Sequence, residues 1–230
     1  MSIKLGSTGF SGIYLGSTKI GAAYLGNVKV YKAAPDGVVI GDKTYPTVVM
    51  PDGREWLALN LDLIWDGLSI PTSGASGTTS QQAMYYNYDD ATYGWNGLKR
   101  GLLYNHYAVN MLQSYRETLC PGWHVPTKDE FDTLVTALGG TSQGAKLKST
   151  TGWYNDANGT DDYGFAGYPS GAFTGGWPGV DNRLSLWSGT YYPGTTTSAY
   201  SCTLTSSNNN ITIYQENRRI QYSVRLIKDV

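Results

Sequence analysis

The chain has few charged residues and few cysteines, and each shortage excludes a class of protein. Charged residues make up only 15% of the 230, and 17 basic residues nearly balance 18 acidic ones. The chain therefore carries no strong field that would attract nucleic acid or an anionic membrane surface. Two cysteines, Cys120 and Cys202, are too few for a disulfide scaffold, and the sequence leaves open whether they pair or stay reduced.

Long hydrophobic runs are missing as well. No apolar run approaches the roughly 18 residues that a membrane span needs. The first residues, Met1 to Gly6, contain no basic region followed by an apolar one, so we expect no signal peptide. What is abundant is Gly (29), Tyr (19) and Trp (7). This composition predicts a folded, turn-rich domain whose surface carries amphipathic rings of the kind that antibody paratopes use.

The N-terminal residues contain a repeat with a period of ten. Leu5-Gly-Ser-Thr8 recurs as Leu15-Gly-Ser-Thr18 and, more loosely, as Leu25-Gly-Asn-Val28. Each unit is typical of a short strand followed by a turn, and such units bury little surface alone. The units also resemble repeats in bacteriophage tail and fibre proteins. Residues 1–32 are therefore predicted to be a β-repeat mounting segment, joined by a turn-rich linker (33–37) to a main domain (38–230); a β-meander without further function is the alternative.

Local patterns predict one hairpin and two helices in the main domain. Pro51-Asp-Gly53 is a turn signal between two apolar segments. A helix is expected from about residue 104 to 118, because one face would carry Tyr104, Ala108, Met111, Leu112 and Tyr115. A second helix should begin at the capping box of Thr127 and Glu130 and end at Gly139. Its buried stripe would be Phe131, Leu134, Val135 and Leu138. Only loops and strands are expected after Gly140.

Seven short motifs then occur in a fixed order along the main domain. They are Asp52–Leu61, Gly101–Ala108, Pro121–Pro126, Lys146–Ser149 with Trp153, Asn158–Phe165, Leu186–Ser188 and Tyr222–Arg225. In this order they resemble the Fibrobacter succinogenes major paralogous domain family, which is similar to C-type-lectin-like folds. The resemblance covers residues 38–229 and implies an α+β domain with two short helices, antiparallel sheets and much loop. It also implies that Trp123, Trp153 and Trp187 belong to the core.

The cysteines depart from the pattern of that family. A cysteine before the Pro-Gly-Trp-His motif is commonly matched there by another just after the C-terminal Val-Arg. This chain keeps Cys120 but has Leu226 at the second position. The resemblance therefore implies that this disulfide is absent, which fits folding in a reducing cytoplasm.

The same fold is used by variable proteins of diversity-generating retroelements. The resemblance implies that ligand-binding residues lie between the Trp-Ser motif and the final Val-Arg strand, here residues 189–221. Polar residues alternate with Tyr200, Cys202 and Leu204, which predicts a strand with one buried and one polar face, although any exposed sheet shows such alternation. Arg218 is a further candidate anchor. The predicted ligand-binding residues are Tyr191, Tyr192, Thr196, Ser198, Ser201, Thr203, Thr205, Asn208, Asn210, Thr212, Tyr214, Glu216, Asn217 and Arg219.

Signals for catalysis are weak. There is no Gly-x-Ser-x-Gly elbow, and the two cysteines lack metal-ligand spacing. Formylglycine-generating enzymes, which have a related fold, use paired cysteines that Cys202 alone does not reproduce. His124 is expected to be a hydrogen-bonded structural residue. Oxygen ligands for Ca²⁺ are available at Asn158, Asp161 and Asp162, but a turn in which these side chains bond the backbone is favoured, so no cofactor is expected.

These observations predict a binding protein that is not an enzyme. The favoured interpretation is a receptor-recognition protein of a phage tail or fibre, or a retroelement-diversified variable protein, that binds a host-surface protein or glycan. It would be made in the bacterial cytoplasm and would contact other virion subunits through residues 1–32. The sequence leaves its oligomeric state open, with a homo-oligomer such as a trimer as one possibility. The alternative is a bacterial surface adhesin or carbohydrate-binding module of fixed specificity, in which Trp153, Trp177, Tyr191 and Tyr192 would stack on sugar rings.

Overall fold

The computed structural model describes residues 37–68, 100–173, 179 and 181–230, together with the backbone of short strands within 13–32 and at 83–84. Trp177 lies outside the described residues. The chain divides into two compact units, Met1–Gly37 and Val38–Val230. Within the described residues, no helix has the length and hydrophobicity needed to cross a membrane.

The N-terminal unit contains two small antiparallel pairs of strands. Strand β1 (Ile13–Leu15) pairs with β2 (Thr18–Ile20), and β3 (Ala22–Leu25) pairs with β4 (Val28–Lys32). The short strands predicted from the repeat are therefore present.

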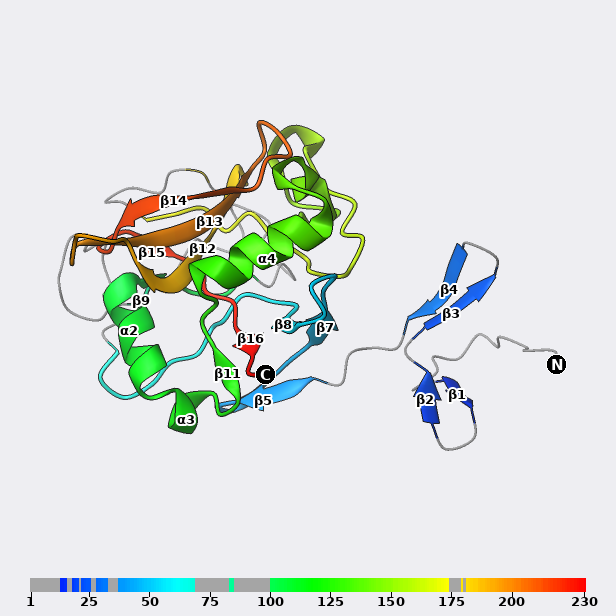
Figure 1. Cartoon of the computed structure of the whole chain (residues 1–230), viewed down its shortest axis with the longest axis horizontal. Coiled ribbons are helices and arrows are strands. Elements are labelled where there is room, and N and C mark those ends of the chain that lie inside the picture. Colours follow the sequence, from blue (N-terminus) through cyan, green and yellow to red (C-terminus); the bar gives the residue numbers. More distant parts are fainter. Residues whose placement is uncertain are drawn as a thin grey trace, which may run out of the picture. The chain divides into compact units, whose positions relative to one another are not determined.

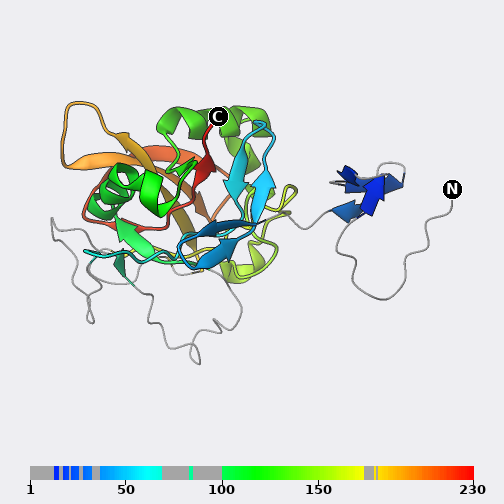
Figure 2. The same ribbon diagram turned by 90° about the horizontal axis from the view of Figure 1, so that it is seen from below.

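Small antiparallel sheets make one side of the second unit (Figures 1 and 2). Strands β5 (Val38–Ile40) and β6 (Lys43–Tyr45) form a hairpin, and a four-stranded sheet has the order β11-β16-β8-β7. The predicted turn at Pro51–Gly53 is confirmed, since Gly53 has a φ of 80° and its N–H donates to the Met50 carbonyl. This sheet is built from β7 (Thr47–Val49), β8 (Glu55–Leu57), β11 (Trp123–His124) and the C-terminal β16 (Ile227–Lys228).

The first predicted helix is shorter than expected and is split. Helix α2 (His106–Ser114) starts after Asn105, whose side chain accepts a hydrogen bond from the Ala108 N–H, and α3 (Arg116–Leu119) follows a break at Tyr115. Tyr104 instead lies in strand β10 (Leu103–Asn105), between β15 (Gln221–Tyr222) and β9 (Ala83–Met84). The assignment of Tyr104 and Tyr115 to one helical face was wrong, because Tyr104 pairs with a strand and Tyr115 is 58% exposed.

Helix α4 (Lys128–Leu138) confirms the second prediction. Thr127 and Glu130 form the reciprocal capping box, and Gly139 ends the helix with a φ of 103°. Two short 3₁₀ turns, η1 (Thr141–Lys146) and η2 (Tyr154–Asp156), interrupt the predicted loops after the helix. All four residues of the predicted stripe are buried: Phe131, Leu134, Val135 and Leu138.

The longest strands form one antiparallel sheet, β12-β13-β14, and α4 lies across it (Figure 1). The strands are β12 (Arg183–Tyr191), β13 (Ser198–Thr205) and β14 (Thr212–Asn217). The unit as a whole is therefore mixed α+β, with few short helices and several antiparallel sheets. This confirms the predicted fold class at that level.

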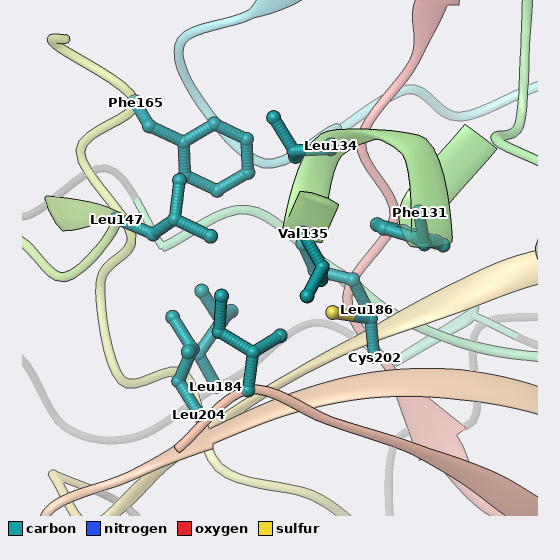
Figure 3. Close-up of a pocket in the computed structure, with 10 residues that line it drawn as sticks. Phe131, Leu134, Val135, Leu147, Phe165, Leu184, Leu186, Cys202 and Leu204 are labelled. Atoms are coloured by element: carbon teal, nitrogen blue, oxygen red, sulfur yellow. The ribbon is translucent and has the colours of Figure 1, made fainter. Parts of the chain in front are cut away.

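Two apolar clusters fill the second unit. One lies under α2 and contains Trp123 and Trp187, and the other lies between α4 and the long sheet and contains Trp56 and Trp153. Burial of the three motif tryptophans confirms their predicted place in the core. The second cluster keeps a void of about 10 Å³ lined by apolar side chains and the Cys202 thiol (Figure 3). A void of this size admits at most one water molecule, so it is a packing gap rather than a ligand site.

Both cysteines are free and buried. Cys120 belongs to the first apolar cluster together with Leu226, and Cys202 belongs to the second. Burial raises the pKa of each thiol to about 12, so neither is an activated thiolate.

Candidate recognition surface

The predicted ligand-binding residues differ widely in exposure. Exposed side chains are Tyr191, Thr196, Asn208, Asn210, Thr212, Asn217 and Arg219. Partly buried ones are Tyr192, Thr205, Tyr214 and Glu216, while Ser198, Ser201 and Thr203 are buried.

Ser198, Ser201 and Thr203 are buried, so they cannot contact a ligand. The expectation of a polar exposed face along β13 is therefore wrong at these three positions. Strand β13 is the central strand, so its two edges pair with β12 and β14, and burial of a side chain depends on what packs on each face. Ser201 stands opposite Trp187, and cross-strand partners share a face, so Ser201 points toward the first apolar cluster. Thr203 bonds the buried Ser185 hydroxyl at 2.8 Å.

Two further predicted residues on β14 point partly inward. Tyr214 is the cross-strand partner of Ser201, so it lies on the same covered face. The Glu216 carboxylate lies close to Tyr222: burial, followed by the charge of Glu216, raises the pKa of this tyrosine. Glu216 thus has a structural neighbour in the interior.

The remaining residues fall into two groups at opposite ends of the long sheet. Ser198 pairs with Asn217 at one end, and Thr203 pairs with Thr212 five positions along β13. At about 3.3 Å per residue the two ends lie roughly 17 Å apart, so one small ligand cannot touch both. We name the first group the tyrosine end (Tyr191, Tyr192, Thr196, Asn217 and Arg219) and the second the asparagine turn (Thr205, Asn208, Asn210 and Thr212).

Arg218 forms the base of the tyrosine end. It is only 6% exposed, which excludes the direct anchoring role considered from the sequence. Its guanidinium lies between two aromatic rings, 4.2 Å from the centroid of Tyr107 and 4.6 Å from that of Tyr191. It donates to the Thr196 carbonyl at 2.7 Å, and its backbone N–H donates to the Thr197 carbonyl at 3.0 Å. Arg218 therefore ties the β12–β13 loop and Tyr191 to helix α2.

His106 completes this base in its neutral form. Burial, against a weaker opposing effect of the Ser188 carbonyl, lowers the pKa of His106 to about 4. Arg218 Nε donates to His106 Nδ1 at 3.2 Å, which leaves Nε2 to donate to the Ser188 carbonyl at 2.9 Å. Both ring nitrogens are therefore occupied in a buried hydrogen-bond chain. The Tyr191 ring lies edge-on to His106 at 5.4 Å, and its hydroxyl accepts a hydrogen bond from Asn110.

The tyrosine end also contains a pair of packed tyrosine rings, formed by Tyr192 and Tyr200. The rings of Tyr192 and Tyr200 are 5.2 Å apart, and Lys128 Nζ lies 5.5 Å from the Tyr200 centroid. Lys128 also bonds through its backbone N–H to the Thr190 hydroxyl at 3.1 Å, which joins the start of α4 to the end of β12. The tyrosine end is thus a set of half-exposed rings on a hydrogen-bonded base.

The asparagine turn has a buried cation of its own. Lys148 is 1% exposed, and its ammonium donates to the Asn208 carbonyl at 2.8 Å and to Asn209 Oδ1 at 3.2 Å. It also lies 4.9 Å from the Trp153 ring centroid. Asn208 to Asn210 form a turn, in which Asn208 Oδ1 accepts from the Asn210 N–H at 2.8 Å.

Two of the three residues considered for Ca²⁺, Asn158 and Asp161, bond the backbone of their own loop. Asn158 Oδ1 accepts from the Trp153 N–H at 3.0 Å, and Asp161 Oδ1 accepts from the Ala166 N–H at 2.8 Å. Across the described ranges, no three His, Cys, Asp or Glu side chains come together as a metal site would require. Trp153, considered for sugar stacking, is only 4% exposed and cannot offer a ring face.

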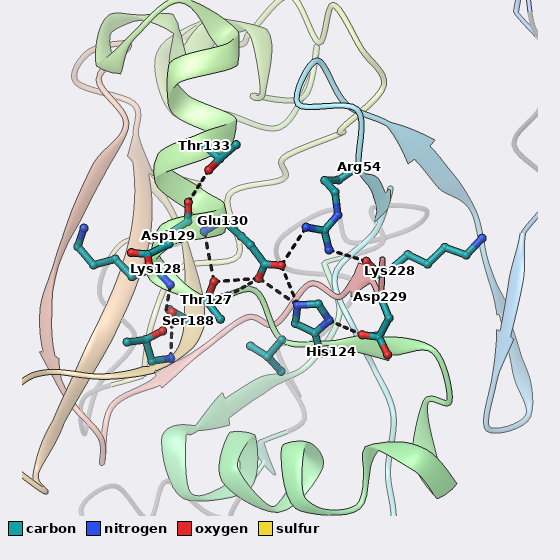
Figure 4. A network of polar contacts seen from close by, with 12 residues as sticks. Arg54, His124, Thr127, Lys128, Asp129, Glu130, Thr133, Ser188, Lys228 and Asp229 are labelled. Carbon is teal, nitrogen blue, oxygen red and sulfur yellow. Dashed lines mark hydrogen bonds and ion pairs between the residues drawn. The ribbon is translucent and has the colours of Figure 1, made fainter.

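His124 lies in a network that ties the C-terminus to helix α4 (Figure 4). Its Nδ1 lies 2.6 Å from Asp229 and its Nε2 3.0 Å from Glu130. Arg54 pairs with Glu130 at 3.1 Å and bonds the Lys228 carbonyl at 2.7 Å. The hydrogen bonding predicted for His124 is confirmed by these contacts, and its structural role stays a prediction.

The network predicts a pH dependence of stability. The hydrogen bond to Glu130 raises the pKa of His124, so its stabilisation is complete below the unfolded value of about 6.5 and is lost as pH rises through the folded value. Burial alone would raise the pKa of Glu130, but bonds from His124 and Thr127 outweigh it and lower the pKa to about 2. That contribution is lost only as pH falls from about 4.5 toward 2.

Urea unfolding at several pH values tests this network. The free energy of unfolding of the wild type, taken relative to that of His124→Gln at the same pH, should fall as pH rises from 6 to 9. His106 is neutral when folded but titrates near pH 6.5 in the unfolded chain, so it changes the stability of both proteins equally and cancels in the difference. An equal fall in both proteins would contradict the assignment to His124.

Sequence reasoning missed several residues of this surface. Tyr107, Asn110 and Lys148 lie outside the predicted window, and only their contacts with Tyr191, Arg218 and Asn208 reveal them. The one sequence signal was indirect: each is a polar or aromatic residue inside or beside a family motif.

Comparison with known proteins identifies the scaffold. No curated protein and no solved structure matches the chain. The model of the Fibrobacter succinogenes major domain matches residues 51–228, which include every strand and helix from β8 to β16 and both ends of the long sheet. The chain therefore belongs to the Fibrobacter succinogenes major domain family.

Proposed function

We propose that this protein is a non-enzymatic recognition protein that binds a host-surface molecule through the tyrosine end. The observation that carries the proposal is the combination of exposed contacts with a fixed base. Tyr191 is 40% exposed while its other surfaces pack on Arg218 and His106. A half-exposed tyrosine held in this way offers a large contact area and loses little conformational freedom on binding.

The proposal extends to the fold of the domain, the assembly to which the protein belongs and its location. The domain would be a C-type-lectin-like fold, an interpretation supported by its two main helices, its long hairpin sheet and its family membership. The protein would be a phage tail or fibre component, made in the bacterial cytoplasm and assembled through residues 1–32, and a location on the bacterial surface is the alternative. Residues at the tyrosine end would be those varied if a retroelement acts on the gene.

Binding to intact cells tests the proposal. Fluorescently labelled protein would be titrated onto a panel of bacterial strains and onto a glycan array. Tyr191→Ala and Arg219→Ala should each weaken binding to a positive strain at least tenfold, about 1.4 kcal/mol, as expected for central contact residues. Arg219→Ala should leave thermal unfolding unchanged, because Arg219 is exposed.

Two control variants distinguish the loss of a ligand contact from a general loss of binding caused by any surface substitution. Tyr154→Ala removes a tyrosine that is 55% exposed and remote in sequence from the window, and it should bind like the wild type. Thr212→Ala at the asparagine turn should also bind normally. Binding that survives both tyrosine-end substitutions, or no saturable binding to any strain or glycan, would sink the proposal. Saturable binding to purified glycans would instead select the adhesin or carbohydrate-binding alternative.

Diversification is tested separately by sequencing the DNA around the gene. A near-copy of the codons for residues 189–221, differing mainly at adenines and next to a reverse-transcriptase gene, is the expected result. Its absence would point to fixed specificity.

A further inference from the structure

A groove separate from the tyrosine end is lined by residues of the segment after β8 and of helices α2 and α3. Its volume is about 370 Å³, within the range of small-ligand pockets. It is lined by Trp65, Asp66, Met111, Tyr115, Thr118 and Leu119.

The floor of the groove is held in place by the core. Trp65 is 8% exposed, and its ring stacks on Tyr104 with 5.8 Å between centroids and 6° between planes. The indole N–H donates to Met111 Sδ at 3.1 Å, so this polar group is already satisfied. The floor therefore offers an apolar, preformed surface, and a ligand that rests on it needs an apolar body.

Among the described residues that line the groove, Asp66 supplies the one unpaired charge. Asp66 is exposed and makes no hydrogen bond or ion pair with any residue that the structure describes. Arg116, the basic residue of helix α3, forms ion pairs with Glu117 at 3.2 Å and with Asp229 at 3.1 Å. Tyr115, which is 58% exposed, adds a free ring whose face attracts cations.

A second groove has the same volume but carries no unpaired charge among its described lining residues, which is why we prefer the groove beside Asp66 as a ligand site. It is lined by Lys43, Tyr45 and Asp62 among others, but Lys43 pairs with Asp62 at 2.6 Å and the Tyr45 hydroxyl also donates to that carboxylate. Its charges cancel, so it has no preference for a charged ligand.

We propose that the groove beside Asp66 binds a small organic cation, an ammonium group carried on an apolar body. The ammonium would lie between the Asp66 carboxylate and the Tyr115 ring, and the body would rest on Trp65, Met111 and Leu119. This site shares no lining residue with the tyrosine end, so it stands or falls independently of the proposed recognition function.

Ligand-observed NMR titration with phenethylammonium chloride tests the site, and 2-phenylethanol serves as the uncharged analogue. The cation should bind saturably and at least about fivefold more tightly than the alcohol, the effect of one partly exposed charge pair. Asp66→Asn should remove this difference. Thr118→Trp, which places a large side chain in the groove from an exposed position, should abolish binding of both compounds.

Glu117→Gln is the matched control, because it removes an equal charge from a neighbouring residue outside the lining. This variant should keep the preference for the cation. Absence of saturable binding, equal binding of the alcohol, or an equal loss in Glu117→Gln and Asp66→Asn would overturn the proposal. The last result would reduce the effect to the general negative field of this surface.

Discussion

Replacing Trp187 with alanine should lower the free energy of unfolding by about 3–5 kcal/mol, the range for a fully buried tryptophan. Trp187 is 0% exposed and packs against the rings of Tyr222 at 4.9 Å and His106 at 5.1 Å. Its indole N–H donates to the Tyr104 carbonyl at 2.8 Å, so the substitution opens a cavity and leaves a buried carbonyl without this donor. Urea unfolding followed by circular dichroism measures the loss.

Two control variants show whether the loss of stability comes from the missing side chain at this buried position. Trp187→Phe should lose less, because it keeps an aromatic ring but not the hydrogen bond. Tyr154→Ala, at an exposed side chain, should change the free energy by no more than about 0.5 kcal/mol. If Trp187→Ala were as stable as the wild type, the assignment of Trp187 to the core would be wrong. Trp187→Ala should also weaken cell binding, since His106 packs on Trp187 and Tyr191 packs on His106.

Replacing Arg225 with methionine should cost a similar amount, about 3–5 kcal/mol, although methionine fills much of the same space. Arg225 is 0% exposed, and its guanidinium donates to Asn60 Oδ1 at 2.9 Å and to the carbonyls of Phe165 and Ala166. Burial lowers the pKa of Arg225 to about 9, which still leaves it charged at neutral pH. Its removal would leave two buried oxygens, of Asn60 and Phe165, and the partly buried Ala166 carbonyl without this donor.

The bond to Ala166 adds a backbone effect. Ala166 has a φ of 50°, a left-handed conformation that costs an alanine about 1–2 kcal/mol, and it is held by Arg225 on one side and Asp161 on the other. Arg225→Met should therefore also speed hydrogen exchange in the loop around residues 161–166. The control is Arg219→Met, an exposed arginine, which should change the free energy of unfolding by no more than about 0.5 kcal/mol. Equal stabilities of the two variants would refute the structural role of Arg225.

Local signals predicted those elements whose formation depends on neighbours in sequence. The capping box of Thr127 and Glu130, the stop at Gly139 and the turn at Gly53 each use groups a few residues apart, and all three are confirmed. The first helix shows the limit of such signals. Its apolar spacing extends to Tyr104, but Asn105 caps the helix and Tyr104 pairs with Tyr222, a residue far away in the sequence.

The candidate site shows the same limit more strongly. Alternation of polar and apolar residues along β13 predicts one exposed face, yet Ser201 and Thr203 are buried because their face of the sheet, which also carries Trp187, packs against the first apolar cluster. Alternation reports which residues share a face, but it does not report what covers the face.

Motifs and local patterns were enough to predict the family, the α+β class and the core tryptophans, because each of these depends on short runs of sequence. Which members of the window 189–221 are exposed, and which end of the sheet holds them, became visible only in the folded chain. The same is true of the buried cations Arg218 and Lys148 beneath the two ends, and of the groove beside Asp66. The physical reason is that burial and the surroundings of a cation depend on contacts between segments distant in sequence, which no local pattern encodes.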